Sequence, residues 1–350
     1  GDAEHGTDLT ARPFDRGLDL SWRRTSYSGL TRALHEQTGG GVGSEPESPG
    51  RGDEADADEA GLLLPEPAGA RLLEVPSPMA DLPSGATFGV VVHSVLETAD
   101  LAGHPDGPRA ALAEAAADVG VRGLAEGLTP DVLAAALEPA VRTPLGPLAD
   151  DRPFASFTSS DVLSELEFEL PLAGGDEPTD RRVLLGEVAA LLREHLPAGD
   201  PVLAYAPSLE GPELARQPLR GYLTGSIDAL LRVASPGAVP RFVVVDHKTN
   251  RLAPPGQPLT AWHYRPEALD AEVLAAHYPL QAMLYCVATH RFLRWRLPSY
   301  DPSEHLGGVL YLFLRGMCGP QTGAETGVWQ WHPPAALVVA LSDLLAGQAR

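Results

Sequence analysis

A chain of 350 residues with 44% hydrophobic residues is long enough to bury the core of one large domain or of two small ones. Its two cysteines, Cys286 and Cys318, are too few for a disulfide framework or a four-cysteine iron–sulfur cluster, and they favour a reducing, cytosolic setting. The formal net charge of −21 argues against tight autonomous binding to nucleic acid.

The first 85 residues have the composition of connecting segments. Because the chain opens with Gly1 and shows no signal peptide or bilayer-spanning apolar run, we expect a fragment or processed form of a longer, non-membrane protein. Residues 1–37 are predicted to be a tether that ends in a Ser-capped lead-in to the domain. Residues 38–85 form an acidic, Gly/Pro-rich insert that we expect to be disordered, since residues 45–59 alone carry seven acids and one base. Residues 86–350 are predicted to hold the folded domain.

This domain begins with helical patterns and one strand. Residues 88–97 have the apolar spacing of an amphipathic helix, and an Ala-rich helical stretch follows over residues 108–137. A lone histidine among aliphatic residues, such as His93 in the first helix, is ordinarily a packed core residue. Residues 164–171 alternate acidic and apolar side chains, which is typical of a half-buried strand. A helix that covers the sheet is expected over residues 181–196.

The stretch from Gly221 to Asn250 is the centre of the sequence. Two apolar runs flank a Pro/Gly-containing turn, which predicts a β-hairpin, and the second run, 242–245, is apolar on both faces and therefore buried on both. It ends in Asp246, His247 and Lys248, and strand alternation places the first and third side chains on one face and His247 on the other. A buried Asp and Lys are costly unless their charge is compensated, and a hard divalent cation with a phosphate would compensate it. Asp228, on the preceding strand, supplies a second carboxylate.

The remaining elements follow the hairpin. A long helix is predicted over residues 270–297, in which Gln281 and Tyr285 are four residues apart and share one face. A surface glutamine and a core tyrosine would show the same spacing. The same helix ends in a basic and aromatic patch that suits either a phosphate backbone or a partner subunit and comprises Arg291, Arg294, Trp295 and Arg296. Residues 307–315 are predicted to form a final buried strand, and residues 333–347 a closing helix.

The pattern of Asp228 followed by Asp246-His247-Lys248 resembles the signature of PD-(D/E)XK nucleases. A lone D-x-K is also met as a solvated salt bridge at a strand end. Three further motifs occur in the family's order and resemble its RecB branch: GSID at 225–228, DHKTN at 246–250 and YPLQAMLY at 278–285. The resemblance implies an α/β, PD-(D/E)XK nuclease fold, in which a central mixed β-sheet is flanked by helices.

The resemblance also implies roles for individual residues. It favours His93 as a metal ligand, because Gly89 to His93 fits the family's Gly-x-x-x-His word, and it makes Glu167 an acid near the metal, although a solvated strand face is the alternative there. The expected catalytic residues are Asp228, Asp246 and Lys248; the metal ligands are His93, Asp228, Asp246 and the carbonyl of His247; the supporting residues are Glu167, Gln281 and Tyr285; and the DNA contacts are Arg251, Arg291 and Arg294. The implied cofactor is Mg²⁺, with Mn²⁺ as a substitute. The absence of a Walker A sequence predicts no ATP site.

The function that the resemblance implies is a Mg²⁺-dependent deoxyribonuclease of the exodeoxyribonuclease V type, which acts in double-strand break processing and recombinational repair. Its expected partners are single-stranded DNA fed from a helicase, RecC- and RecD-like subunits and a RecA-like recombinase, in the bacterial cytoplasm at the nucleoid. The alternatives are an AddAB-like nuclease and a non-catalytic docking module for a recombinase or for partner subunits.

Overall fold

The computed structural model describes residues 23–31, 71–121, 125, 127–176, 179–212, 214–235 and 237–348. Most of the predicted tether, except residues 23–31, and most of the predicted insert, except residues 71–85, lie outside these residues. Six strands form one sheet: β1 (Arg23–Thr25), β2 (Val162–Pro171), β3 (Gly221–Val233), β4 (Arg241–Lys248), β5 (Leu306–Phe313) and β6 (Val328–Trp331). The helices are α3 (Ala86–Thr98), α4 (Pro108–Val119), α5 (Pro130–Arg142), α6 (Glu187–His195), α7 (Ala206–Leu209), α8 (Pro266–Ala275), α9 (Tyr278–Arg296), α10 (Pro302–His305) and α11 (Ala335–Leu345).

The sheet is mixed. Along the path β1-β3-β4-β5-β6, the pairs β1–β3 and β4–β5 are parallel, while β3–β4 and β5–β6 are antiparallel; β2 pairs antiparallel with the other edge of β3. Strand β3 is long enough to pair with β4 through its second half and with β1 through its first three residues. The predicted fold class is confirmed.

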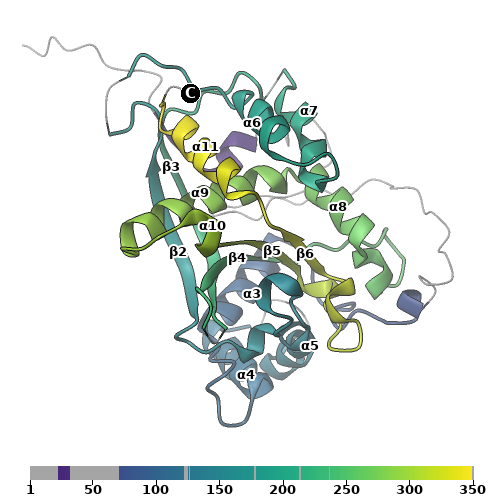
Figure 1. Cartoon of the computed structure of the whole chain (residues 1–350). Coiled ribbons are helices and arrows are strands. Elements are labelled where there is room, and N and C mark those ends of the chain that lie inside the picture. The colour runs from purple at the N-terminus through teal and green to yellow at the C-terminus, as the bar shows by residue number, and fades with distance from the viewer. Residues whose placement is uncertain are drawn as a thin grey trace, which may run out of the picture.

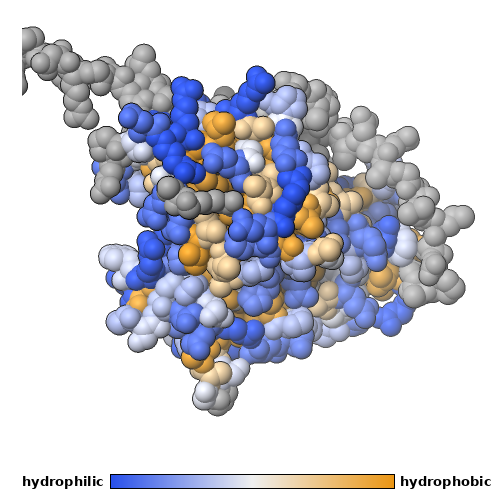
Figure 2. Space-filling view, turned by 45° about the horizontal axis from the view of Figure 1, so that its top comes forward, coloured by the Kyte–Doolittle hydropathy of each residue, from blue (hydrophilic) through white to orange (hydrophobic). Residues whose placement is uncertain are grey.

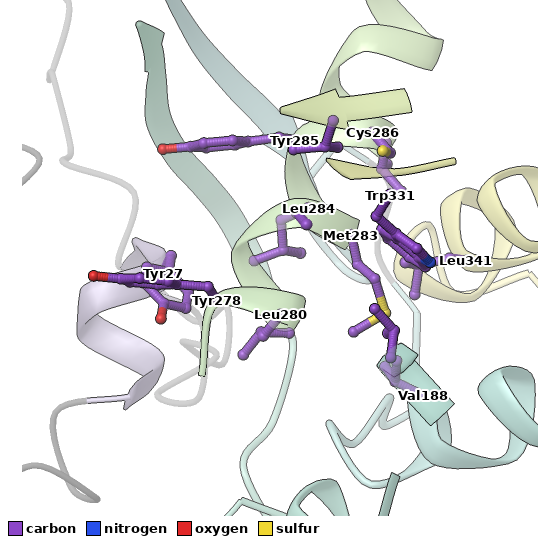
Figure 3. Packing of buried hydrophobic residues seen from close by; sticks show 14 of the residues in the cluster. Tyr27, Val188, Tyr278, Leu280, Met283, Leu284, Tyr285, Cys286, Trp331 and Leu341 are labelled. Atoms are coloured by element: carbon purple, nitrogen blue, oxygen red, sulfur yellow. The ribbon is translucent and has the colours of Figure 1, made fainter. Parts of the chain in front are cut away.

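Helices cover both faces of this sheet, as Figure 1 shows, with α3, α4 and α5 on one side and α6, α9 and α11 on the other. The alternation of β4 sends Val243 and Val245 into a core with α3, α4 and α5, and Val244 into a second core with α6, α9 and α11. Figure 3 shows the second core around α9, where Met283 and Trp331 pack together on one side of the helix and Tyr285 projects from the opposite side. The strand that carries the Asp-His-Lys sequence is therefore held rigidly from both faces.

Three predicted helices have different bounds. The helix expected over residues 270–297 is two helices, because His277 adopts a left-handed conformation with a φ of 60° and Pro279 can only stand in the first turn of a new helix. The stretch 108–137 is likewise divided, by Gly120 in the left-handed conformation and by Pro130 at the start of α5. Helix α6 begins only at Glu187. Strands β1 and β6 were not predicted.

Residues 71–85, which were predicted to belong to the disordered insert, are packed against the domain. Pro76 forms an isolated bridge with Thr260, and Met79 is fully buried. The guanidinium of Arg315 donates to backbone carbonyls of this segment. The composition of the segment did not reveal these contacts, because the groups that hold it in place are main-chain carbonyls.

The surface is largely polar. On the face in Figure 2, hydrophilic residues dominate and apolar residues lie in small groups between them. Among the described residues, Trp295 is the most exposed large apolar side chain, at 76%. Both cysteines are buried and free. No helix in the described part of the chain has the length and apolar character needed to cross a membrane.

Candidate active site

The predicted catalytic residues meet where β3 and β4 part. The antiparallel pairing of these strands ends at Ala229 and Val245, one residue before Asp228 and Asp246. The backbone N–H of His247 is thereby free of the β3 ladder and donates to the Asp228 carboxylate at 2.7 Å. The end of pairing gives the site room, and the rigid strands on either side fix its position.

Asp228 is the acceptor at the centre of this cluster. In addition to the N–H of His247, its Oδ2 lies 3.3 Å from His93 Nδ1 and 3.4 Å from His247 Nδ1. Burial acts to raise the pKa of Asp228, but the neighbouring His93 and His247 outweigh it and hold that pKa well below its ordinary value. Asp228 is therefore ionised at neutral pH.

The imidazole of His247 lies on the opposite face of β4 from Lys248, as strand alternation predicts. It points to the face that Val243 and Val245 share with α3, where it makes edge-to-face contacts with His93 and Phe154, at centroid distances of 5.9 and 5.5 Å. Pairing with β3 has ended at this point while pairing with β5 continues, so the ring can also approach Asp228. The structure therefore places both the backbone N–H and the ring of His247 at the cluster.

Asp246 and Lys248 form a buried ion pair beside Asp228. The Nζ of Lys248 lies 2.6 Å from Asp246 Oδ2, and the two residues are 2% and 3% exposed. Burial raises the pKa of Asp246 to about 7; the charge of Asp228 adds to this rise, while Lys248 opposes it. Lys248 also lies 4.1 Å from the ring centroid of Tyr278. The two carboxylates of the site thus differ in their protonation behaviour.

Helix α9 supplies a polar chain that begins at Lys248. The Nζ of Lys248 donates to Gln281 Oε1 at 3.2 Å, and Gln281 Nε2 donates to the hydroxyl of Tyr285 at 3.1 Å. The Tyr285 ring meets Phe168 of β2 edge to face at 6.0 Å. The structure thus brings Gln281 and Tyr285 together with the lysine, as their four-residue spacing suggested.

A second pair of acids was missed by the sequence analysis. The neighbouring register pairs place Glu165 of β2 level with Asp228, and Glu165 has a φ of 47°. Burial raises the pKa of Glu97, and a hydrogen bond and like charge from Glu165, with the charge of Asp228, raise it further. Glu97 follows His93 by four residues, so the helical spacing was the available signal. Glu167 is level with Ser226 rather than with Asp228, so the register and the contact with Glu97 make Glu165 the better candidate for a supporting acid.

The donor set suits a hard divalent cation. It combines the carboxylates of Asp228 and Asp246 with an imidazole and a carbonyl, and a nearby cation would favour the ionised form of Asp246. In the described part of the chain, no three His, Cys, Asp or Glu side chains already surround a common point as metal ligands. The reason lies in the contacts given above, since Asp246 pairs with Lys248 while Asp228 faces the two histidines.

The three predicted DNA contacts differ in their surroundings. Arg291 is committed to the fold, because its guanidinium donates to the carbonyls of Pro171 and Ser342 and to the Ser342 hydroxyl. We therefore do not retain Arg291 among the proposed DNA contacts. Arg294 is exposed at the end of α9. Arg251 donates to the carbonyl of Gln257 at 2.8 Å and lines a pocket.

Comparison with known proteins identifies the family. Residues 68–326 match the PD-(D/E)XK nuclease superfamily. The chain belongs to this superfamily. Its nucleases generally use divalent metal ions, in keeping with the donor set at Asp228 and Asp246.

The relatives of this PD-(D/E)XK nuclease domain carry one name. The chain is 49% identical to the RecBCD enzyme subunit RecB of Mycolicibacterium smegmatis over 98% of its length, and 48% identical to that of Mycobacterium tuberculosis over 95%. It is 30% identical to RecB of Escherichia coli over 97%. The chain spans 31%, 29% and 24% of these three proteins, less than a third of each. The resemblance to RecB inferred from the sequence is confirmed.

Proposed function

We propose that this chain is the nuclease domain of a RecB-like subunit and hydrolyses DNA phosphodiester bonds with Mg²⁺, as an exodeoxyribonuclease V type enzyme. The observation that carries the proposal is the parting of β3 and β4 at Asp228 and Asp246, with Lys248 paired to the second carboxylate at 2.6 Å. Two acids and a lysine at a strand end are suited to charge stabilisation at a phosphate. The similarity to RecB proteins supports the choice of DNA as substrate.

In this proposal each residue has a distinct task. Asp228, Asp246, His93 and the His247 carbonyl would hold Mg²⁺, which when bound polarises the phosphoryl oxygen and lowers the pKa of a coordinated water. Lys248 presents a positive charge to the negative charge that develops on the phosphorane. Gln281 accepts from Lys248 and so orients the ammonium group toward the site. Outside the metal ligands, Tyr285 would position the DNA backbone without reading its sequence.

The path of the DNA is proposed from the remaining basic residues. Arg251 lines a pocket of about 500 Å³ that also contains the acidic Asp81 and the apolar residues Leu82, Pro83, Leu128 and Val132. In this proposal the Arg251 guanidinium binds a phosphate and the apolar residues contact a sugar or a base. Arg294 lies beside the exposed Trp295, a combination that suits a single strand.

The chain carries 47 acidic and 26 basic residues, so we propose that it receives its substrate from other subunits rather than capturing it. RecC- and RecD-like subunits are the proposed partners, in the bacterial cytoplasm, and a RecA-like recombinase is a further one.

The test is cleavage of end-labelled single-stranded DNA by the purified chain in Mg²⁺, with EDTA as the metal-free control. Cleavage is expected in Mg²⁺ and is expected to be lost in the variants Asp246→Ala and Lys248→Ala. Glu167→Gln is the matched control, because it removes an acid from the neighbouring strand that lies outside the cluster, and it is expected to cleave at the wild-type rate. Absence of metal-dependent cleavage by the folded wild-type chain, with and without partner subunits, would favour the docking module instead.

A further inference from the structure

A fully buried arginine links the end of β4, which carries Asp246 and Lys248, to the segment that leads into α3, which carries His93. Arg315 stands directly after β5, in a short 3₁₀ turn, and is 0% exposed. Its Nε donates to the carbonyl of Thr249 at 2.7 Å, one residue beyond Lys248. Its terminal nitrogens donate to the carbonyls of Met79, at 2.7 Å, and Pro83. One guanidinium thus connects the end of β4 to the segment that leads into α3.

The start of α3 depends on this connection. The helix begins after Gly85, which has a φ of 118° and provides no side-chain cap, and no acidic residue stands in the first turn. The Arg315 guanidinium also lies 5.2 Å from the ring centroid of Phe88, in the first turn of the helix. The planar guanidinium therefore fixes both the approach to α3 and its first turn relative to β4.

The position of α3 determines the position of His93. His93 follows Phe88 by five residues on the same rigid helix, and its Nδ1 reaches Asp228 Oδ2 at 3.3 Å. A displacement of the helix by about 1 Å would break a contact of that length. The carboxylates, in contrast, are carried by β3 and β4 and are fixed by the sheet.

We propose that Arg315 is a positioning residue of the nuclease site, which holds α3, and with it His93, in register with Asp228 and the end of β4. This inference rests on the proposed function for its consequence in catalysis, but the placement of His93 is measurable in the metal-free protein. Arg315 touches neither substrate nor metal in this proposal. It acts through His93.

The chain contains a matched control for this proposal. Arg291 is also a largely buried arginine that donates to backbone carbonyls, those of Pro171 and Ser342, at 2.8 and 2.7 Å. It joins β2 to α11, and these hydrogen bonds go to neither α3 nor β4. Loss of Arg291 is expected to lower stability in the same way as loss of Arg315, without affecting His93.

The experiment compares Arg315→Lys and Arg315→Met with Arg291→Lys and Arg291→Met in the 350-residue chain. The first measurement is the ¹⁵N chemical shift of His93 Nδ1 in the metal-free protein, assigned by its absence from His93→Ala. This shift reports the contact with Asp228. It is expected to move in both Arg315 variants and to stay in place in both Arg291 variants. Lysine is not expected to rescue, because one ammonium group cannot reach Thr249 and the α3 approach together.

The second measurement is the Mg²⁺ concentration for half-maximal cleavage of single-stranded DNA. Removal of a group that orients a metal ligand typically weakens metal binding by about 10- to 100-fold, so a rise of that size is expected for Arg315→Lys and no rise for Arg291→Lys. An unmoved His93 resonance in folded Arg315 variants overturns the proposal, as does a failure of both Arg315 variants to fold. If the wild type shows no cleavage while the His93 resonance still moves in the Arg315 variants, the proposed function alone is overturned.

Discussion

The two carboxylates of the site should respond oppositely to neutralisation. Asp246→Asn replaces a buried acid whose pKa is raised to about 7 by burial, with the amide mimicking the protonated form. Asp228→Asn replaces an acid whose pKa is held well below its ordinary value by His93 and His247. We expect the first substitution to stabilise the metal-free protein at alkaline pH and the second to destabilise it at neutral pH.

The sign and size follow from proton linkage. The pKa of Asp246 is higher in the folded protein than its ordinary value of 3.8, so the folded state binds this proton more tightly. The stability that it contributes is complete below pH 3.8 and is lost as the pH rises to about 7. The difference between the raised and the ordinary pKa of Asp246 corresponds to about 4 kcal/mol of unfolding free energy, since one pKa unit is worth about 1.4 kcal/mol. Asp228 contributes stability that is present at neutral pH and is lost as the pH falls through its depressed pKa.

The assay is urea unfolding of the metal-free wild type and both variants at a series of pH values. The series runs from about pH 3.5 to about pH 8.5, so that it spans the ordinary and the raised pKa of Asp246. Asp246→Asn is expected to exceed the wild type by up to ~4 kcal/mol at the alkaline end and to match it at the acidic end. Both variants are expected to lose metal-dependent cleavage. Destabilisation by Asp246→Asn at alkaline pH, or changes of the same sign in the two variants, would refute the electrostatic reasoning.

Three further outcomes are expected. His93→Ala should weaken Mg²⁺ and Mn²⁺ binding in a calorimetric titration, with partial recovery of cleavage at high metal; a lower melting temperature with unchanged affinity would make His93 a core residue. Deletion of residues 39–70 should leave the melting temperature and cleavage near those of the full chain, whereas deletion of 39–83 should lower both, because it removes carbonyl partners of Arg315. Arg294→Gln should weaken single-strand binding and reduce the slope of log affinity against log salt by about 0.7, and an unchanged slope would exclude a phosphate contact there.

The parts of the site that the sequence predicted are those set by local periodicity. Period-two alternation on a strand placed Asp246 and Lys248 together, and helical spacing placed Gln281 beside Tyr285. The predicted hairpin added Asp228 and the resemblance to RecB added His93, and the structure brings Oδ2 of the first within 3.3 Å of Nδ1 of the second. Such features can be predicted from the sequence because each depends on the periodicity of a single helix or strand, or on motifs that follow one another in a known order.

The parts that the sequence missed depend on register and on main-chain partners. Which acid of β2 stands level with Asp228 is decided by strand pairing, so Glu165 was not distinguishable from Glu167 beforehand. Arg315 looks like an ordinary charged residue after a buried strand, since its partners are carbonyls that no side-chain pattern reveals. The same carbonyls explain why residues 71–85 were expected to be disordered.

The raised pKa of Asp246 changes how the pH dependence of metal binding is to be interpreted. A histidine ligand must lose its proton to bind metal, and Asp246, whose pKa burial raises to about 7, must lose one as well. Where both groups hold a proton, metal binding displaces two protons, so the logarithm of the metal affinity should rise with pH with a slope of about two. In His93→Ala the proton of this imidazole is no longer displaced, and the slope should fall by about one. The change in slope therefore identifies the histidine as a ligand, because a packed core histidine would leave the slope of the wild type intact.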